Sequence, residues 1–120
     1  MRYNEKYYFV LSLLELIEKM NREVDVVIVE GINDKKVLRE LGFKKEILTV
    51  GTRKRPNGKF TILTDFDEEG KKIAKRLCKK YGEKHLIKVY RKKFNELLSR
   101  YGIKEIEGIR SIVREVLNLF

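Results

Sequence analysis

Short apolar runs alternate along this chain with longer segments whose apolar residues recur every three or four positions. The clearest short run is VDVVIV at 24–29, and its β-branched character is typical of a strand buried on both faces of a sheet. Strands that alternate with helices form mainly parallel sheets covered on both faces. The sequence therefore predicts an α/β fold of Rossmann-like type, with a four-stranded, mostly parallel sheet flanked by helices.

The predicted strands occupy residues 24–29, 47–50, 60–64 and 86–90, and a short fifth strand is considered at 103–106. Helices are predicted at 4–20, from Asn33 or Asp34 to residue 41, from Asp67 or Glu68 to residue 81, around 94–101, and along the apolar stripe from Ile109 to Phe120. A length of 120 residues suits one domain, with its core at about 24–90 between the N-terminal helix 4–20 and a helical extension at 92–120.

The chain is strongly basic, with 28 Lys and Arg against 18 Asp and Glu and a formal net charge of +10. Such an excess attracts polyanions, so we expect a nucleic acid partner, either RNA or DNA. The abundance of Lys, Glu and Ile is also typical of thermophile surfaces, which explains many charges but not their imbalance. The single cysteine, Cys78, excludes an intramolecular disulfide, and no stretch is apolar enough to span a bilayer, so we expect a cytoplasmic protein.

Acidic residues stand where two of the predicted strands end. Glu30 follows the first strand directly, and Asp65 and Asp67 follow the strand at 60–64. In open α/β sheets the functional crevice lies beyond the carboxyl ends of the strands. Asp65 and Asp67 are two positions apart, so in extended backbone their side chains share a face. Converging carboxylates repel each other unless a cation lies between them, and a hard divalent ion such as Mg²⁺ suits oxygen ligands.

Each of these acidic residues also has an ordinary structural interpretation. Asp67 stands where a helix N-cap is expected, and Glu30 could be a solvated strand-end carboxylate. For Asp34, a helix cap and a supporting position behind the metal ligands are equally open. The functional interpretation depends on the set, because the acidic residues end neighbouring strands on the same side of one sheet.

The segments VVIVEGINDKKVLRELGF and ILTDFDEEGKKIAKRL resemble the Toprim domain of primases, topoisomerases and OLD-family nucleases. The resemblance includes Glu30 with Gly31, and Asp65 and Asp67 with Gly70, and it extends over about 24–90. It implies that Glu30 is a general acid or base that also helps to hold metal, and that Asp65 and Asp67 bind Mg²⁺, with Mn²⁺ as an alternative. Asp34, Gly31 and Gly70 would support these ligands. The nine-residue loop 51–59 replaces a helix found in many Toprim proteins, and the C-terminal part loosely resembles small Toprim ribonucleases that mature ribosomal RNA.

Two basic segments are candidates for holding a nucleic acid backbone: the loop with Arg53, Lys54 and Arg55, and the helix with Lys71 and Lys72. A solvated helix face is the alternative for the more distal lysines of that helix. These features lead us to expect a Mg²⁺-dependent phosphotransfer enzyme acting on nucleic acid, either a nuclease or an RNA-processing enzyme. A non-catalytic binding module, and a Toprim subunit of a primase or repair complex with a protein partner, remain open.

Overall fold

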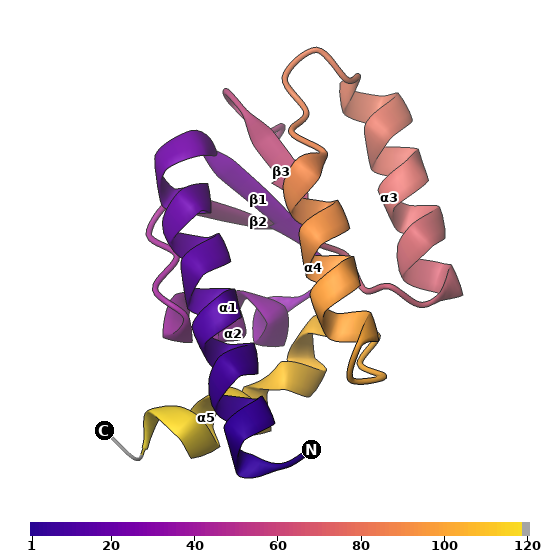
Figure 1. Cartoon of the computed structure of the whole chain (residues 1–120). Coiled ribbons are helices and arrows are strands. Elements are labelled where there is room, and N and C mark those ends of the chain that lie inside the picture. Colours follow the sequence, from indigo (N-terminus) through magenta and orange to yellow (C-terminus); the bar gives the residue numbers. More distant parts are fainter. Residues whose placement is uncertain (119–120) are drawn as a thin grey trace.

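The computed structural model describes residues 1–118, and Figure 1 shows helices on both sides of a small sheet. The elements in chain order are α1 (Tyr3–Glu23), β1 (Val26–Val29), α2 (Ile32–Glu40), β2 (Glu46–Thr49), β3 (Phe60–Ile62), α3 (Glu68–Tyr81), α4 (Val89–Ser99), the 3-10 helix η1 (Ile106–Ile109) and α5 (Arg110–Leu117). Phe120, the last residue of the predicted C-terminal stripe, lies outside the described residues. No helix within residues 1–118 is long and apolar enough to cross a membrane.

The sheet has three strands in the order β2-β1-β3, and both pairings are parallel. The central strand β1 is buried along its whole length, which explains why VVIV lacks the alternation of a half-exposed strand. Because all three strands run the same way, the segments that follow Val29, Thr49 and Ile62 leave the sheet at one edge. The predicted parallel α/β architecture is confirmed, and it places the ends of β1 and β3 side by side.

The predicted fourth strand at 86–90 is not formed. Only one isolated bridge, between Phe60 and Leu86, extends the sheet there, and helix α4 already begins at Val89. Tyr90 is buried and continues the helical stripe of Phe94 and Leu97 toward the N-terminus of α4. The burial of that stripe therefore favours helix over strand. The suggested strand at 103–106 is also absent, because η1 begins at Ile106.

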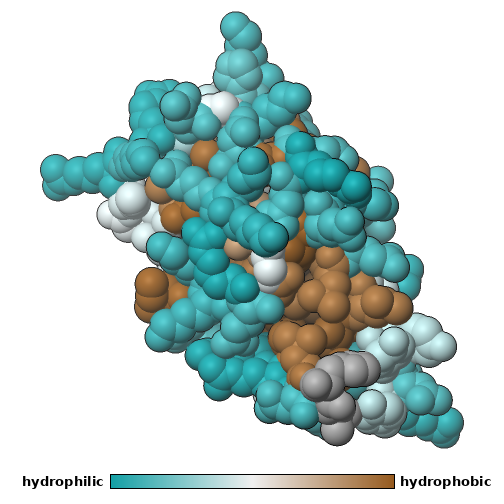
Figure 2. Space-filling model, turned by 90° about the vertical axis from the view of Figure 1, so that its left-hand side faces the viewer, coloured by the Kyte–Doolittle hydropathy of each residue, from teal (hydrophilic) through white to brown (hydrophobic). Residues whose placement is uncertain are grey.

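Two hydrophobic clusters lie on opposite faces of the sheet. Side chains of α1, α4 and α5 pack with Val27 and Val29 on one face. On the other face, Ala74 and Leu77 of α3 pack with Ile28 and other strand residues. The side of the molecule seen in Figure 2 is largely hydrophilic, in keeping with 38% charged residues, and its largest apolar area lies at the lower right. Among the described residues, the helical side chains of this second cluster all belong to α3.

Candidate functional site

The carboxylates of Glu30 and Asp65 come together at the carboxyl edge of the sheet. Glu30 directly follows β1, and Asp65 follows the neighbouring strand β3 after two further residues. The backbone N–H of Asp65 donates a hydrogen bond to Glu30 Oε1 at 3.2 Å. Neighbouring parallel strands place their ends side by side, so residues 35 positions apart in the chain meet here. The structure thus brings together two of the three predicted metal ligands.

Both carboxylates are costly to ionise in this position. Burial raises the pKa of Glu30, and the negative charge of Asp65 raises it further. Burial likewise raises the pKa of Asp65, with a contribution from the charge of Asp67, while a hydrogen bond from the backbone N–H of Ile106 (2.9 Å to Oδ1) opposes the shift. Partly desolvated, mutually repelling carboxylates are an arrangement that a cation would stabilise.

Asp67 caps helix α3. Its Oδ1 accepts a hydrogen bond from the backbone N–H of Gly70 at 2.7 Å, so the structural interpretation of this residue is confirmed. Its charge nevertheless acts on both Glu30 and Asp65, raising the pKa of each. Asp67 is therefore close enough to contribute to the electrostatics of the pair, but one of its oxygens is already engaged.

Asp34 lies behind the pair and does not open its helix. Helix α2 begins at Ile32 with Gly31 as its N-cap, two to three residues before the predicted caps Asn33 and Asp34. The Oδ2 of Asp34 accepts a hydrogen bond from the Gly31 N–H at 3.1 Å, which fixes the turn directly after Glu30. Burial raises the pKa of Asp34 to about 6, and the charge of Asp65 adds to the shift. Asp34 therefore supports the backbone that carries Glu30.

Gly70 permits the close approach of α3 to the end of β3. A Cβ atom at this position would lie 2.0 Å from the carbonyl oxygen of Asp65, which no side chain tolerates. The hydroxyl of buried Thr64 donates a hydrogen bond to the Gly70 carbonyl at 2.7 Å and fastens the same turn. Gly31 differs, because a Cβ there would meet open space. Its contribution is its backbone N–H rather than its missing side chain.

The segment that precedes α5 closes the site on one side, which the sequence did not reveal. The N–H of Phe66 donates to the carbonyl of Lys104 at 2.6 Å, and the N–H of Ile106 donates to Asp65. The charge of Glu107 raises the pKa of Asp65 and of Asp34. The Lys104 carbonyl and the Ile106 N–H are backbone groups, so no side-chain motif in the sequence predicts these two contacts.

Arg91 is a second residue that the sequence did not single out. Its guanidinium donates to the carbonyls of Thr64 (2.8 Å) and Asp65 (3.2 Å), and its Cζ lies 4.8 Å from the centre of the Phe66 ring. A cation is thereby fixed at the outer edge of β3, beside the carboxylates. No sequence signal distinguishes Arg91 from the other basic residues of α4, since its role depends on carbonyls 26 and 27 positions away.

Two of the predicted nucleic acid contacts in loop 51–59 lie away from the carboxylates. Lys54 pairs with Glu46 at the start of β2 (2.6 Å), and the Arg55 guanidinium lies 5.4 Å from the ring centre of Tyr81 at the end of α3. Both partners belong to the amino-terminal edge of the sheet, because the loop crosses from the end of β2 to the start of β3. Lys54 and Arg55 therefore do not join the site, and Arg53, nearer the end of β2, is exposed.

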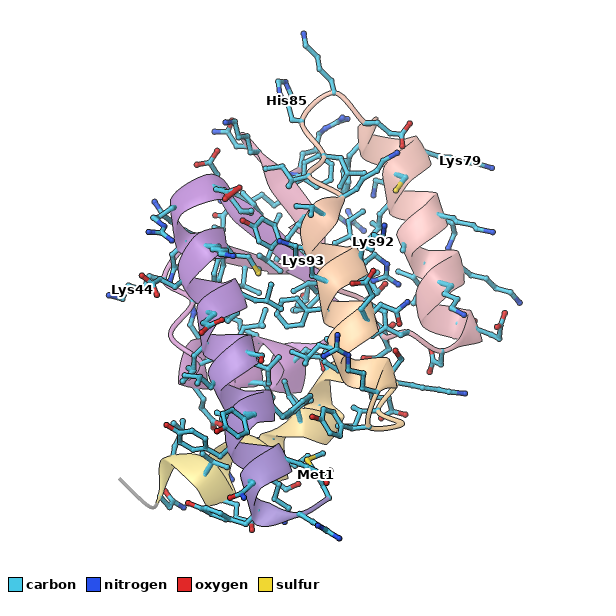
Figure 3. The ribbon with its side chains drawn as sticks, viewed as in Figure 1. Met1, Lys44, Lys79, His85, Lys92 and Lys93 are labelled. Atoms are coloured by element: carbon cyan, nitrogen blue, oxygen red, sulfur yellow. The ribbon has the colours of Figure 1, made fainter. Side chains whose placement is uncertain are left out.

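Lys71 and Lys72 border a groove of about 1030 Å³ whose walls come from α3 and α4. We call it the α3/α4 groove. Figure 3 labels Lys79 and Lys92, which line it from α3 and α4 respectively. Phe66 and Glu68, which flank Asp67 in the chain, line the groove at the end nearer the carboxylates. The predicted basic face of α3 thus borders a concave surface next to the site.

The donor chemistry suits Mg²⁺, but the ligand set is smaller than predicted. Within residues 1–118, no three His, Cys, Asp or Glu side chains are arranged to hold a metal ion. Glu30 and Asp65 are a pair of carboxylates, and Mg²⁺ is commonly held in proteins by one or two carboxylates, with waters and substrate phosphates completing its shell. In donor type, these two residues fit a Mg²⁺ ion whose remaining ligands are waters or phosphates.

Comparison with known proteins gives relatives but no activity. No family model matches the sequence. The chain is 34% identical over 110 residues to a UPF0292 protein of Thermococcus gammatolerans, covering 82% of this chain and 79% of the relative. It is 32% identical over 116 residues to a UPF0292 protein of Thermococcus kodakarensis, covering 88% and 86%. A solved structure titled "putative protein from Aquifex aeolicus" matches with a TM-score of 0.62 and 24% identity over 81% of this chain and 94% of that one, which supports the fold alone.

Proposed function

The chain belongs to the UPF0292 family, and we propose that it is a Mg²⁺-dependent phosphotransfer enzyme that acts on nucleic acid as a nuclease. The observation that carries the proposal is the meeting of Glu30 and Asp65 at the carboxyl edge of two neighbouring parallel strands. Burial raises the pKa of both, and the charge of Asp65 raises the pKa of Glu30 further. The Arg91 guanidinium lies beside the pair, but it donates to the backbone carbonyls of Thr64 and Asp65. The ionised carboxylates of Glu30 and Asp65 repel each other, an arrangement that a bound cation would stabilise.

Asp65 and Glu30 would hold the metal. Asp67 is close enough for its charge to raise the pKa of both residues. A bound Mg²⁺ would polarise a phosphate and offset its charge. Glu30 is suited to proton transfer, because a carboxyl with a raised pKa exchanges its proton closer to neutral pH. Arg91 holds the backbone of Thr64 and Asp65 in place, so it positions the metal ligand rather than taking part in the reaction.

The resemblance to Toprim domains supports the same assignment. Its two motifs are at the ends of β1 and β3, which are neighbours in the sheet. The fourth strand that is missing here would lie outside β3 and is not needed to bring Glu30 to Asp65. The excess of basic residues supports a polyanionic substrate.

The test is cleavage by purified protein. A mixed panel of labelled RNAs and DNAs is incubated with Mg²⁺, with Mn²⁺ or with chelator, and the parent is compared with Asp65→Asn and Glu30→Gln. Glu96→Gln, an exposed carboxylate on α4, is the matched control. We expect metal-dependent cleavage by the parent and the control only. Equal cleavage by all four proteins would show that the activity comes from a contaminant and would refute the assignment.

A non-catalytic module that grips phosphates through the same metal is the second candidate. The observation in its favour is that the described residues offer two converging carboxylates rather than a closed set of three. In that case the parent would bind nucleic acid more tightly with Mg²⁺ and show no turnover on any member of the panel.

A further inference from the structure

The lining of the α3/α4 groove combines basic walls with an apolar floor. Among its lining residues are seven Lys and Arg and only two carboxylates, Glu68 and Glu83. Those two already pair with Lys71 (3.8 Å) and Lys88. Within residues 1–118, the lining lysines Lys72, Lys75, Lys79 and Lys92 have no carboxylate partner. The groove therefore presents uncompensated positive charge to whatever occupies it.

The lysines of the α3 wall are regularly spaced. Lys71, Lys75 and Lys79 are four residues apart in one helix, so they follow one another along the same wall at intervals of about 6 Å. This interval is similar to the distance between successive phosphates of a polynucleotide chain. A ligand with negative charges repeated at that distance can contact all three.

The floor is apolar and poor in hydrogen-bonding groups. It is formed by Ile62, Phe66, Ala74, Cys78, Leu86 and Ile87. Backbone groups at the outer edge of β3 already have partners. The Phe60 N–H donates to the His85 carbonyl, and the Phe60 carbonyl accepts from the Ile87 N–H. The Ile62 carbonyl accepts from Arg91. Such a floor suits the flat faces of bases and not their hydrogen-bonding edges.

Arg91 and Phe66 form a stacked pair at the carboxylate end of the groove. The guanidinium lies over the Phe66 ring at 4.8 Å and is held by the carbonyls of Thr64 and Asp65. Both residues line the groove. Phe66 itself is buried, so the member of the pair open to a ligand is the half-buried Arg91. Arginine planes are surfaces on which unpaired bases stack. This pair is next to Asp65 in space, so a stacked nucleotide would have its phosphate near the carboxylates.

We propose that the α3/α4 groove binds a single-stranded segment of RNA or DNA, with phosphates along the α3 lysines and bases on the apolar floor, and leads it to Glu30 and Asp65. The path to the carboxylates rests on the proposed function, whereas binding in the groove does not. A duplex keeps its bases inside its stack and would leave the floor uncovered. An acidic amphipathic peptide helix could use the same charges, and the experiment separates it from a single strand.

The first measurement is binding in chelator, where no metal-dependent cleavage occurs. Fluorescent single-stranded and duplex oligonucleotides of the same sequence are titrated with the parent, with Lys75→Glu/Lys79→Glu, and with Lys44→Glu/Lys93→Glu, whose lysines do not line the groove (Figure 3). The two double variants have the same net charge. We expect the groove variant to weaken single-strand binding by at least about tenfold and to lower its salt slope, and the control to change it by less than about threefold. Equal losses in both variants would show diffuse electrostatic attraction and overturn the proposal.

The second measurement uses Cys78, the one cysteine of the chain, which lies half-buried in the floor. Its reaction with a maleimide should be slowed severalfold by saturating single strand and not by duplex at the same concentration. Equal protection by duplex, or protection only by an acidic helical peptide, would overturn the single-strand assignment. Cleavage distinguishes the two proposals. If single strand protects Cys78 but the parent never cleaves that strand, the groove proposal stands and the nuclease proposal is refuted. If the parent cleaves single strand that does not protect Cys78, the nuclease proposal stands and the groove proposal is refuted.

Discussion

The backbone N–H of Asp65 donates to Oε1 of Glu30 at 3.2 Å, which connects the end of β3 to the end of β1. The carboxylate of Glu30 thus accepts a hydrogen bond from the main chain of Asp65, whose own side chain is the second carboxylate. The contact holds the two acidic groups together although their charges repel, and this balance leads to specific expectations for their variants.

Asp65→Asn should remove Mg²⁺ binding without unfolding the protein. The pKa of Asp65 is raised, so its charge is unfavourable in the folded state, and an amide oxygen can still accept from the Ile106 N–H. Thermal melts at neutral pH should show a midpoint without metal at or above that of the parent. The rise in melting temperature that Mg²⁺ produces in the parent should be absent. A variant that melts far below the parent in chelator would identify Asp65 as a structural residue.

Glu30→Gln should separate metal binding from turnover. Glutamine keeps an acceptor for the Asp65 N–H but cannot exchange a proton at neutral pH, so cleavage should fall by about 100-fold or more. Stabilisation by Mg²⁺ in thermal melts should persist at reduced strength, because Asp65 remains. Glu96→Gln serves as the control for both measurements. Cleavage by Glu30→Gln at the parent's rate would show that another group carries the proton.

Asp34 should make the folded state less stable as pH rises. Its pKa is raised from 3.8 to about 6, so its contribution to stability is fully present below about pH 4 and is lost as pH rises through 6. Asp34→Asn lacks this titration. The difference in unfolding free energy between variant and parent, measured with urea, should therefore shift in favour of the variant by about 1–3 kcal/mol between pH 4 and pH 8. A difference that stays constant with pH would contradict the burial of this carboxyl.

Gly70→Ala should be strongly destabilising, whereas Gly31→Ala should not. The added Cβ at Gly70 would lie 2.0 Å from the Asp65 carbonyl oxygen, so the turn that carries two of the acidic residues must move, at a cost of about 3 kcal/mol or more. At Gly31 a Cβ meets open space and the backbone is extended (φ −146°), so we expect a cost of less than about 1 kcal/mol. Urea unfolding of both variants measures the contrast. Similar costs at the two positions would show that the approach of α3 to β3 is looser than described.

Several features of this protein follow from local sequence. VVIV is apolar at every position, and such a run suits a strand covered on both faces, which fixes β1 and the place of Glu30 after it. Helix α3 has the predicted bounds because Asp67 caps its start and Gly82 ends it with a positive φ of 75°. These signals are local, since each depends on residues within a few positions.

Other features depend on contacts between distant segments. The residues at 86–90 have the composition of a strand, but α4 begins at Val89 because Tyr90 joins the buried helical stripe, while Arg91 satisfies the carbonyls that a fourth strand would have met. The backbone of Ile106 reaches Asp65 from 41 positions away, and no motif marks it. The sequence by itself determined the parallel α/β plan and the acidic strand ends. Only the tertiary structure decided the number of strands and the closure of the site, because both depend on which backbone groups of distant segments form hydrogen bonds. It also decided between the two interpretations of Asp67 that the sequence left open, by showing its carboxylate bound to the Gly70 N–H.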